Sequence, residues 1–100
     1  TGEHWVDAEL HRTRGDLLLA RSARNIKKAE TAFLEALEVA RGQEAKSLEL
    51  RAATSLARLW GENKKRAEAH ELLAPIYGWF TEGFDTADLK EAKALLDELN

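Results

Sequence analysis

Two histidines and an aspartate near the start of the chain are the closest grouping of residues able to ligate a metal. His4, Asp7 and His11 are spaced by three and four positions, so on a helix they would share one face. Two imidazoles and one carboxylate are an incomplete set for zinc. The favoured alternative is a hydrated helix start, in which Asp7 complements the positive end of the helix dipole. No metal or other cofactor is expected.

The usual signatures of catalysis are missing from the sequence. The chain has no cysteine, which excludes thiolate catalysis, disulfides and cysteine-ligated zinc. Ser22, Ser47 and Ser55 have no histidine near them in the sequence, and the 6 glycines are too scattered to form a phosphate-binding loop. We therefore expect a protein that is not an enzyme.

Cationic residues gather around two expected turns of the chain. We call this set the basic edge: Arg21, Arg24, Lys27, Lys28, Lys64, Lys65 and Arg66. One interpretation is docking of an acidic partner or of nucleic acid. The favoured interpretation is two hydrated turns whose field is diluted by Glu30 and Glu68. The net charge of −3 likewise does not favour nucleic acid as a partner.

The last part of the chain combines aromatic and acidic residues. The aromatic cluster consists of Tyr77, Trp79, Phe80 and Phe84. The favoured interpretation is a plug that locks the last helix onto the second of two helical hairpins, and the alternative is a ligand site. The acidic residues after it include Asp88 and Glu91, which suit either a helix start or end-to-end contacts between copies.

The composition predicts an all-α fold. The 100 residues fit one domain, and 44% hydrophobic with 33% charged residues indicates a globular chain. Good helix formers dominate, whereas valine and isoleucine, which favour strands, are scarce. No apolar run approaches the roughly 20 residues that a membrane span requires, and no signal peptide is visible. A cytoplasmic protein without a membrane partner is therefore expected.

Apolar spacing and turn residues divide the chain into five expected helices. They lie near residues 5–20, 26–42, 45–61, 64–80 and 86–99. Asn25 is expected to cap the second helix and Thr86 the fifth. Pro75 removes one backbone donor, so a kink or an early stop is expected in the fourth helix.

Two helical hairpins repeat along the chain, at about 4–43 and 45–80, followed by a capping helix at about 86–99. Ala29, Phe33 and Ala36 fall on Ala69, Leu73 and Ile76 at an offset of forty residues. In each hairpin a small residue precedes a bulky one. We therefore expect small side chains to meet large ones between stacked helices.

This pattern resembles the tetratricopeptide repeat, a tandem helical hairpin that forms an α-solenoid. The residues that carry it, with two aromatics of the expected plug, form the structural set: Gly15, Leu18, Ala29, Phe33, Ala36, Leu56, Ala57, Trp60, Ala69, Leu73, Ile76, Trp79 and Phe84. In that family the first helix of each hairpin lines the ligand surface. Carried over by position, the resemblance implies a partner-binding face of Glu9, Arg12, Asp16, Arg51, Thr54 and Arg58.

A narrower resemblance covers residues 72–86 and 89–96. This stretch is similar to the C-terminal end of large bacterial signalling proteins, which join an adenylate or guanylate cyclase domain, or another output domain, to a predicted ATPase and a helical-repeat tail. The resemblance implies a scaffold that contacts other proteins or upstream domains of the same chain. The alternatives are a nucleic-acid-associated regulator using the basic edge, and a purely structural end cap.

The start of the chain suggests a fragment of a longer protein, because the first helix arrives with almost no residues before it. Trp5, Leu10 and Leu17 are then expected to face a preceding repeat. Without that repeat, the same face predicts self-association, with a homodimer as the expected form.

Overall fold

The computed structural model describes the backbone of residues 2–80 and 86–99, and the side chains of residues 8–22, 24–80 and 86–99. The described backbone contains α-helices and no strand, which confirms the predicted all-α class. The helices are α1 (Gly2–Arg21), α2 (Ile26–Gly42), α3 (Lys46–Glu62), α4 (Arg66–Trp79) and α5 (Ala87–Leu99), with a short 3-10 helix, η1 (Ala23–Asn25). The expected Phe84 contact lies outside the described residues.

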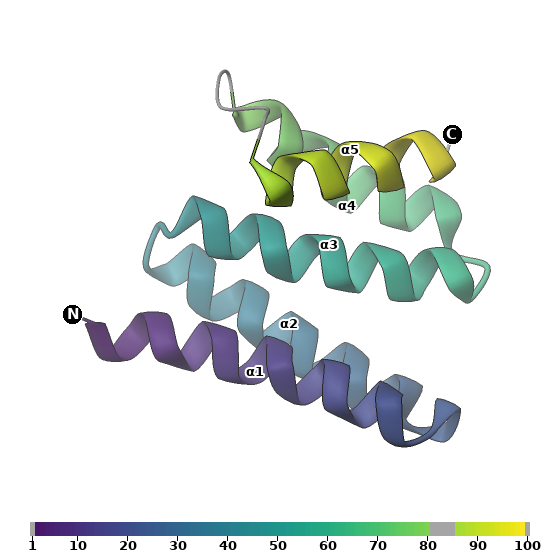
Figure 1. Ribbon diagram of the computed structural model, residues 1–100, viewed down its shortest axis with the longest axis horizontal. Helices are drawn as coiled ribbons and strands as arrows, with labels where there is room; N and C mark the ends of the chain where they lie inside the picture. Colours follow the sequence, from purple (N-terminus) through teal and green to yellow (C-terminus); the bar gives the residue numbers. More distant parts are fainter. Residues whose placement is uncertain (1, 81–85, 100) are drawn as a thin grey trace.

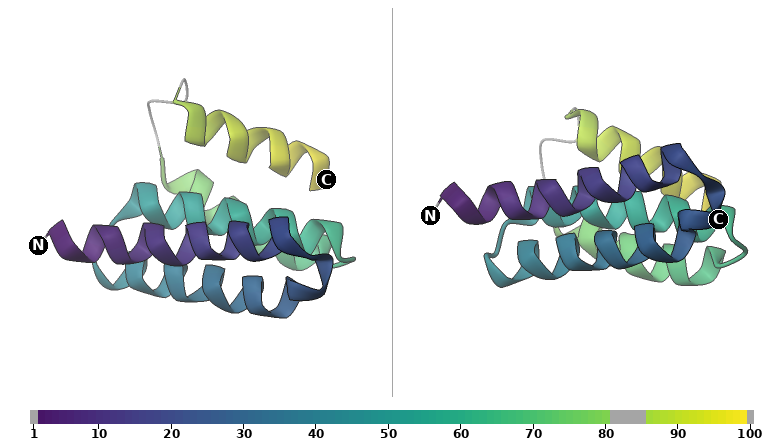
Figure 2. Two further views of the ribbon diagram at one scale, coloured as in Figure 1. Left: turned by 60° about the horizontal axis from the view of Figure 1, so that its bottom comes forward. Right: turned by 90° about the horizontal axis from the view of Figure 1, so that it is seen from below.

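The helices form two layers (Figures 1 and 2). In Figure 1, α1, α3 and α5 run in one direction in the nearer layer, while α2 and α4 run in the opposite direction behind them. The molecule measures 38 × 37 × 19 Å, and its thin dimension matches two layers of helices. Each helix packs on the next, and α1 also contacts α3 while α3 contacts α5. The odd-numbered helices therefore form one continuous surface.

Small residues meet large ones where α1 crosses α2. A Cβ atom added at Gly15 would lie 2.5 Å from Cε1 of Phe33, which is closer than two carbons can approach. Phe33 is one of the largest fully buried side chains, together with Leu50, Leu56 and Leu73. The alanines of the structural set are buried completely: Ala29, Ala36, Ala57 and Ala69. The predicted pairing of a small with a large residue is thus present at this crossing.

The predicted aromatic plug is wrong for Trp79. Its side chain is 57% exposed, and its ring lies under Lys46 Nζ at 5.3 Å and edge-on to Phe80 at 5.1 Å. The reason is its position at the last residue of α4, where the helix ends outside the packed core. Tyr77 and Phe80 do pack partly against the core, as does Trp60, whose Nε1 donates to Glu30 Oε2 at 2.6 Å.

The expected cap at Asn25 is also wrong, and so is the early stop that was one of the two alternatives expected at Pro75. The side chain of Asn25 makes no capping hydrogen bond to α2; its Nδ2 instead donates to the carbonyl of Leu18 at 2.9 Å. The fourth helix does not stop early, since α4 continues through Pro75 to Trp79. Thr86 does cap α5, with the Leu89 amide donating to its hydroxyl at 3.4 Å.

Left-handed residues end α2 and α3. Glu44 has a φ of 57° and Lys64 a φ of 66°. Beyond them, the amide of Ala45 donates to the carbonyl of Ala40, and that of Lys65 to the carbonyl of Trp60, both at 2.9 Å. Bonds of this span define the Schellman helix end, in which the left-handed residue is usually glycine.

Candidate interaction groove

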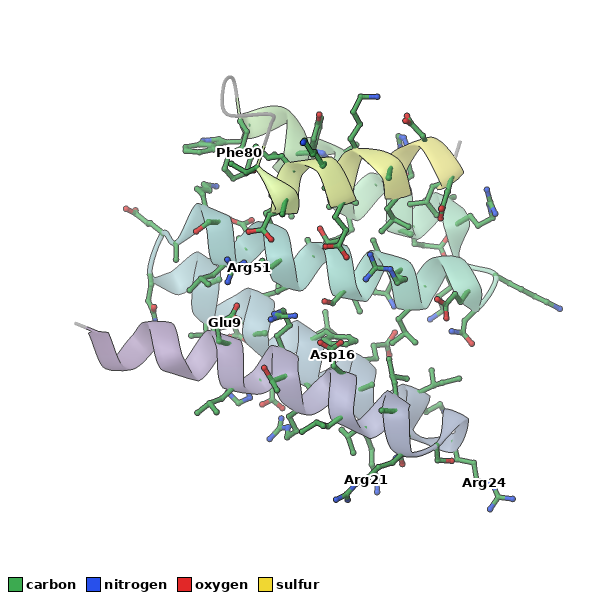
Figure 3. All side chains as sticks on the ribbon, viewed as in Figure 1. Glu9, Asp16, Arg21, Arg24, Arg51 and Phe80 are labelled. Atoms are coloured by element: carbon green, nitrogen blue, oxygen red, sulfur yellow. The ribbon has the colours of Figure 1, made fainter. Side chains whose placement is uncertain are left out.

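A polar groove of about 340 Å³ lies between α1, α3 and α5. Each of these helices contributes charged side chains to it, and the lining residues are Arg12, Asp16, Arg51, Thr54, Ser55, Arg58, Asp88 and Glu91. Figure 3 shows Glu9, Asp16 and Arg51 pointing into the space between α1 and α3. The surface formed by the odd-numbered helices is therefore charged where it is hollowed.

On α1, three charged residues follow helical spacing. Glu9, Arg12 and Asp16 are separated by three and four positions, so they share one face of the helix. Arg12 donates through Nη2 to Glu9 at 2.9 Å and through Nη1 to Asp16 at 3.3 Å. The guanidinium of Arg12 is thus held between two carboxylates at the edge of the groove.

Arg51 of α3 connects all three walls of the groove. Its Nε donates to Asp88 Oδ2 of α5 at 2.8 Å, and its Nη1 lies 3.7 Å from Glu9 Oε2 of α1. One guanidinium therefore ties together helices that are far apart in the sequence. The geometry suits arginine, whose planar group offers several donors in fixed directions.

About two helical turns further along α3, Arg58 makes a second link to α5. Its Nη2 donates to Glu91 Oε1 at 2.5 Å. Between the two arginines lies Thr54, which is only 5% exposed and donates its hydroxyl to the carbonyl of Leu50 at 2.7 Å. Thr54 therefore forms the floor of the groove, and its hydroxyl donor is already used.

The ion pairs shift the pKa values of the central residues toward their charged forms. The hydrogen bond from Arg12 lowers the pKa of Glu9 against the opposing effect of burial, and the charge of Arg51 adds to this. The hydrogen bond to Glu9 raises the pKa of Arg12, and the hydrogen bond to Asp88 raises that of Arg51. The groove therefore presents fixed positive and negative charges at neutral pH.

The groove residues on α1 and α3 were predicted from the sequence, whereas those on α5 were not. The six predicted residues come from α1 and α3, and the structure brings them together. The sequence alone assigns Asp88 and Glu91 to a helix start or to end-to-end contacts, whereas in the structure both pair with predicted arginines. Their spacing of three positions, which places two carboxylates on one face of α5, is the signal that could have found them.

The basic edge lies at the end of the molecule where α1 meets α2 and α3 meets α4. Both turns are at the same end in Figure 1, and Figure 3 shows Arg21 and Arg24 there. Lys65 Nζ lies 3.8 Å from Glu30 Oε2, and Arg66 donates to the carbonyl of Glu98. Among the described residues the other members of this edge form no ion pair: Arg21, Arg24, Lys27, Lys28 and Lys64.

The histidine grouping can be followed only at His11. The side chains of His4 and Asp7 lie outside the described residues. Nδ1 of His11 is 3.2 Å from Glu35 Oε2 of α2, and Arg14 Nη2 is 3.1 Å from the same oxygen. Within the described side chains no cluster of three or more potential ligands has the geometry to hold a metal ion.

Comparison of the chain with protein-family models, with curated proteins and with solved structures gave no match. Function is therefore inferred from the residues and geometry of the chain itself. Among the described helices, none combines the length and apolar character needed to cross a lipid bilayer.

Proposed function

We propose that the chain is a non-catalytic scaffold of the tetratricopeptide type that binds a segment of another protein in the groove between α1, α3 and α5. The observation that carries this proposal is the groove itself. Its walls come from the first helix of each hairpin and from α5, and they display the guanidinium groups of Arg12, Arg51 and Arg58 together with carboxylates. Such fixed, directional groups give specificity to protein contacts.

The arrangement of the helices supports the repeat interpretation. Each hairpin packs on the next, and α5 occupies the place that the first helix of a third hairpin would take, against α3 and α4. Contacts from α1 to α3 and from α3 to α5 are those expected of neighbouring first helices in an α-solenoid. The resemblance implies that this scaffold belongs to a bacterial signalling ATPase or cyclase, and a cytoplasmic location is part of the same proposal.

The charges of the groove favour a partner segment of mixed charge. Three arginines face the four carboxylates of Glu9, Asp16, Asp88 and Glu91, so the two signs nearly cancel. A strongly acidic segment would have to compete with those carboxylates for the same donors. A segment carrying both signs can exchange ion pairs with the groove without leaving a buried charge unpaired.

A structural end cap is the second candidate function, favoured by the outer side of α5. Its inner side buries Leu89, Ala92, Leu95 and Leu99. Its outer residues are exposed and mostly charged: Lys90, Lys93, Ala94, Asp97 and Glu98. Terminal repeats require such a polar outer face. An end cap would need no partner in the groove, so the two functions differ in their response to groove variants.

The test is binding to a peptide array in which acidic, basic and mixed-charge sequences are varied systematically. Arg58→Glu places a negative charge beside Glu91 and should abolish binding of the selected peptides. Lys93→Glu makes the same change of charge on the outer side of α5, and this variant should still bind the selected peptides. Circular dichroism verifies that both variants are folded. Absence of any selected peptide, or equal binding by both variants, would favour the end cap.

A salt titration with a fluorescent DNA duplex tests the nucleic-acid alternative. Phosphate contacts by the basic edge would make DNA binding fall steeply as salt is added. Binding in the groove should depend less on salt and should not respond to Lys27→Glu. Salt-sensitive DNA binding that is lost in Lys27→Glu would support the regulator instead.

A further inference from the structure

An apolar stripe is exposed on α1, away from the other helices. Leu10 and Leu17 are each 60% exposed, although both are large hydrophobic residues. They are seven positions apart, which is close to two helical turns, so they project from the same face with Thr13 between them. Together with His11 and Arg14 they line a shallow, mainly apolar hollow.

This stripe is separate from the groove. At about 100° per residue, the positions of Leu10 and Leu17 lie on a different face of α1 from Glu9 and Asp16, which line or border the groove. They also lie away from Gly15, which faces α2. A partner on the stripe would therefore leave the groove accessible.

The internal repeat allows the face of α1 that carries Leu10 and Leu17 to be compared with the equivalent face of α3. The first and third helices match at an offset of forty-two residues, at which Gly15 and Leu17 correspond to Ala57 and Leu59. At the same offset Leu10 corresponds to Ala52. Both Ala52 and Leu59 are buried in the core. The equivalent face of α3 is therefore a surface for packing between helices, whereas on α1 it is open.

We propose that a second copy of the chain covers this stripe, with the two α1 helices antiparallel. In the pair, Leu10 of each copy packs on Leu17 of the other, and Thr13 lies beside the two-fold axis. The stripe is complementary to itself because its leucines are equally distant from the midpoint between positions 13 and 14. Head-to-tail stacking is disfavoured, since the outer side of α5 offers charged residues to the leucines.

The charges beside the stripe are compatible with this pairing. Oε2 of Glu35 on α2 accepts a hydrogen bond from Arg14 Nη2 at 3.1 Å and lies 3.2 Å from Nδ1 of His11. The guanidinium of Arg14 is next to the proposed axis, and both Arg14 and Glu35 remain about half exposed. Arg14 of one copy can therefore also pair with Glu35 of the other, so opposite charges meet where the two copies approach.

The consequence is a dimer that carries two grooves. Two linked grooves would hold a partner with two binding segments, or a partner that is itself dimeric, more tightly than one groove alone. The dimer is independent of the proposed function, because the chain can dimerise whether or not the groove binds a peptide.

Sedimentation equilibrium over a wide range of concentrations tests the dimer. The apparent mass of the wild-type protein should rise from 11.2 kDa toward twice that value as the concentration increases. Leu10→Glu with Leu17→Glu should remain at the monomer mass at every concentration. Leu34→Glu is the matched control, because Leu34 is an exposed leucine of α2 outside the stripe and its change should leave dimerisation intact. The proposal would be overturned by a wild type that stays monomeric, or by a loss of dimerisation in Leu34→Glu as large as that in the double variant.

Disulfide trapping tests the antiparallel register, and the absence of native cysteine makes each variant report on one position. Thr13→Cys should form a covalent dimer on mild oxidation, whereas Leu34→Cys should not. A mixture of Leu10→Cys and Leu17→Cys chains should link to each other more than to themselves. Preferential linking of Leu10→Cys to itself would indicate parallel helices and would refute the proposed pairing.

Discussion

Gly15 of α1 and Phe33 of α2 are so close that a methyl group on the glycine would overlap the aromatic ring. The nearest ring atom, Cε1, would be 2.5 Å from the added carbon. Phe33 is fully buried, and because buried side chains are closely packed its ring can yield only if its neighbours also shift. This pair therefore sets the distance between the two helices of the first hairpin.

Gly15→Ala should destabilise the protein despite the higher helix propensity of alanine. The propensity gain is about 0.5–1 kcal/mol, whereas overpacking a core costs about 1–3 kcal/mol. Urea unfolding measures the net change. Gly42→Ala is the control, since a methyl group there meets nothing within 4 Å and should raise stability. A gain of similar size at both positions would show that the ring of Phe33 does not constrain the helix crossing.

Glu9→Gln should reduce stability at neutral pH and have little effect in acid. The hydrogen bond from Arg12 lowers the pKa of Glu9 below its ordinary value of 4.5. A lowered folded-state pKa gives a stabilisation that is complete above the unfolded-state pKa and is lost as the pH falls through the folded-state value. The difference in unfolding free energy between the wild type and Glu9→Gln should therefore narrow as the pH falls below 4.5 and close once the pH is below the lowered folded-state pKa of Glu9.

Urea unfolding at several pH values measures this difference. Glu38→Gln, a change in an exposed carboxylate of α2, is the control and should have a much smaller effect at neutral pH. A wild-type advantage over Glu9→Gln that persists unchanged in acid would mean that the ion pairs of Glu9 do not stabilise the fold.

Leu73→Ala should destabilise the protein far more than Trp79→Ala. Leu73 is fully buried, and truncation of such a side chain costs about 2–5 kcal/mol. Trp79 is largely exposed and loses mainly its contacts with Lys46 and Phe80, for which about 1 kcal/mol is expected. Chemical denaturation compares the two. Equal losses would place the ring of Trp79 in the core, contrary to its position in the structure.

Lys64→Gly should stabilise the turn between α3 and α4 by about 0.5–1 kcal/mol, because glycine adopts a positive φ without the steric cost that a side chain brings. Lys64 has a φ of 66° and so carries that cost. Lys64→Ala separates the backbone effect from the loss of the charge, since alanine keeps the strain. The melting temperature should rise for Lys64→Gly and not for Lys64→Ala. An equal rise in both variants would identify the loss of the charge as the cause.

The positions and ends of most helices could be predicted from the sequence because they depend on neighbouring residues. Apolar spacing, turn residues and the cap at Thr86 act within a few positions, where the chain has little freedom. The close approach at Gly15 was also predictable, because a small residue followed in the next helix by Phe33 indicates where two helices can nest.

The other contacts depend on how the helices are placed in space. Arg51 and Asp88 are 37 positions apart, and only the packing of α5 on α3 brings them to 2.8 Å. Trp79 has the same aromatic character as a core residue, but the end of α4 leaves it outside the core. Asn25 has the side chain of a helix cap, but in the folded chain its amide donates to the carbonyl of Leu18 at the end of α1.

Local side-chain chemistry therefore determined which segments are helical and which faces are apolar. The tertiary structure decided which charges pair and which apolar residues stay exposed. The reason is that helix formation is governed by interactions between residues a few positions apart, whereas the groove and the open stripe on α1 depend on the distance and orientation between whole helices.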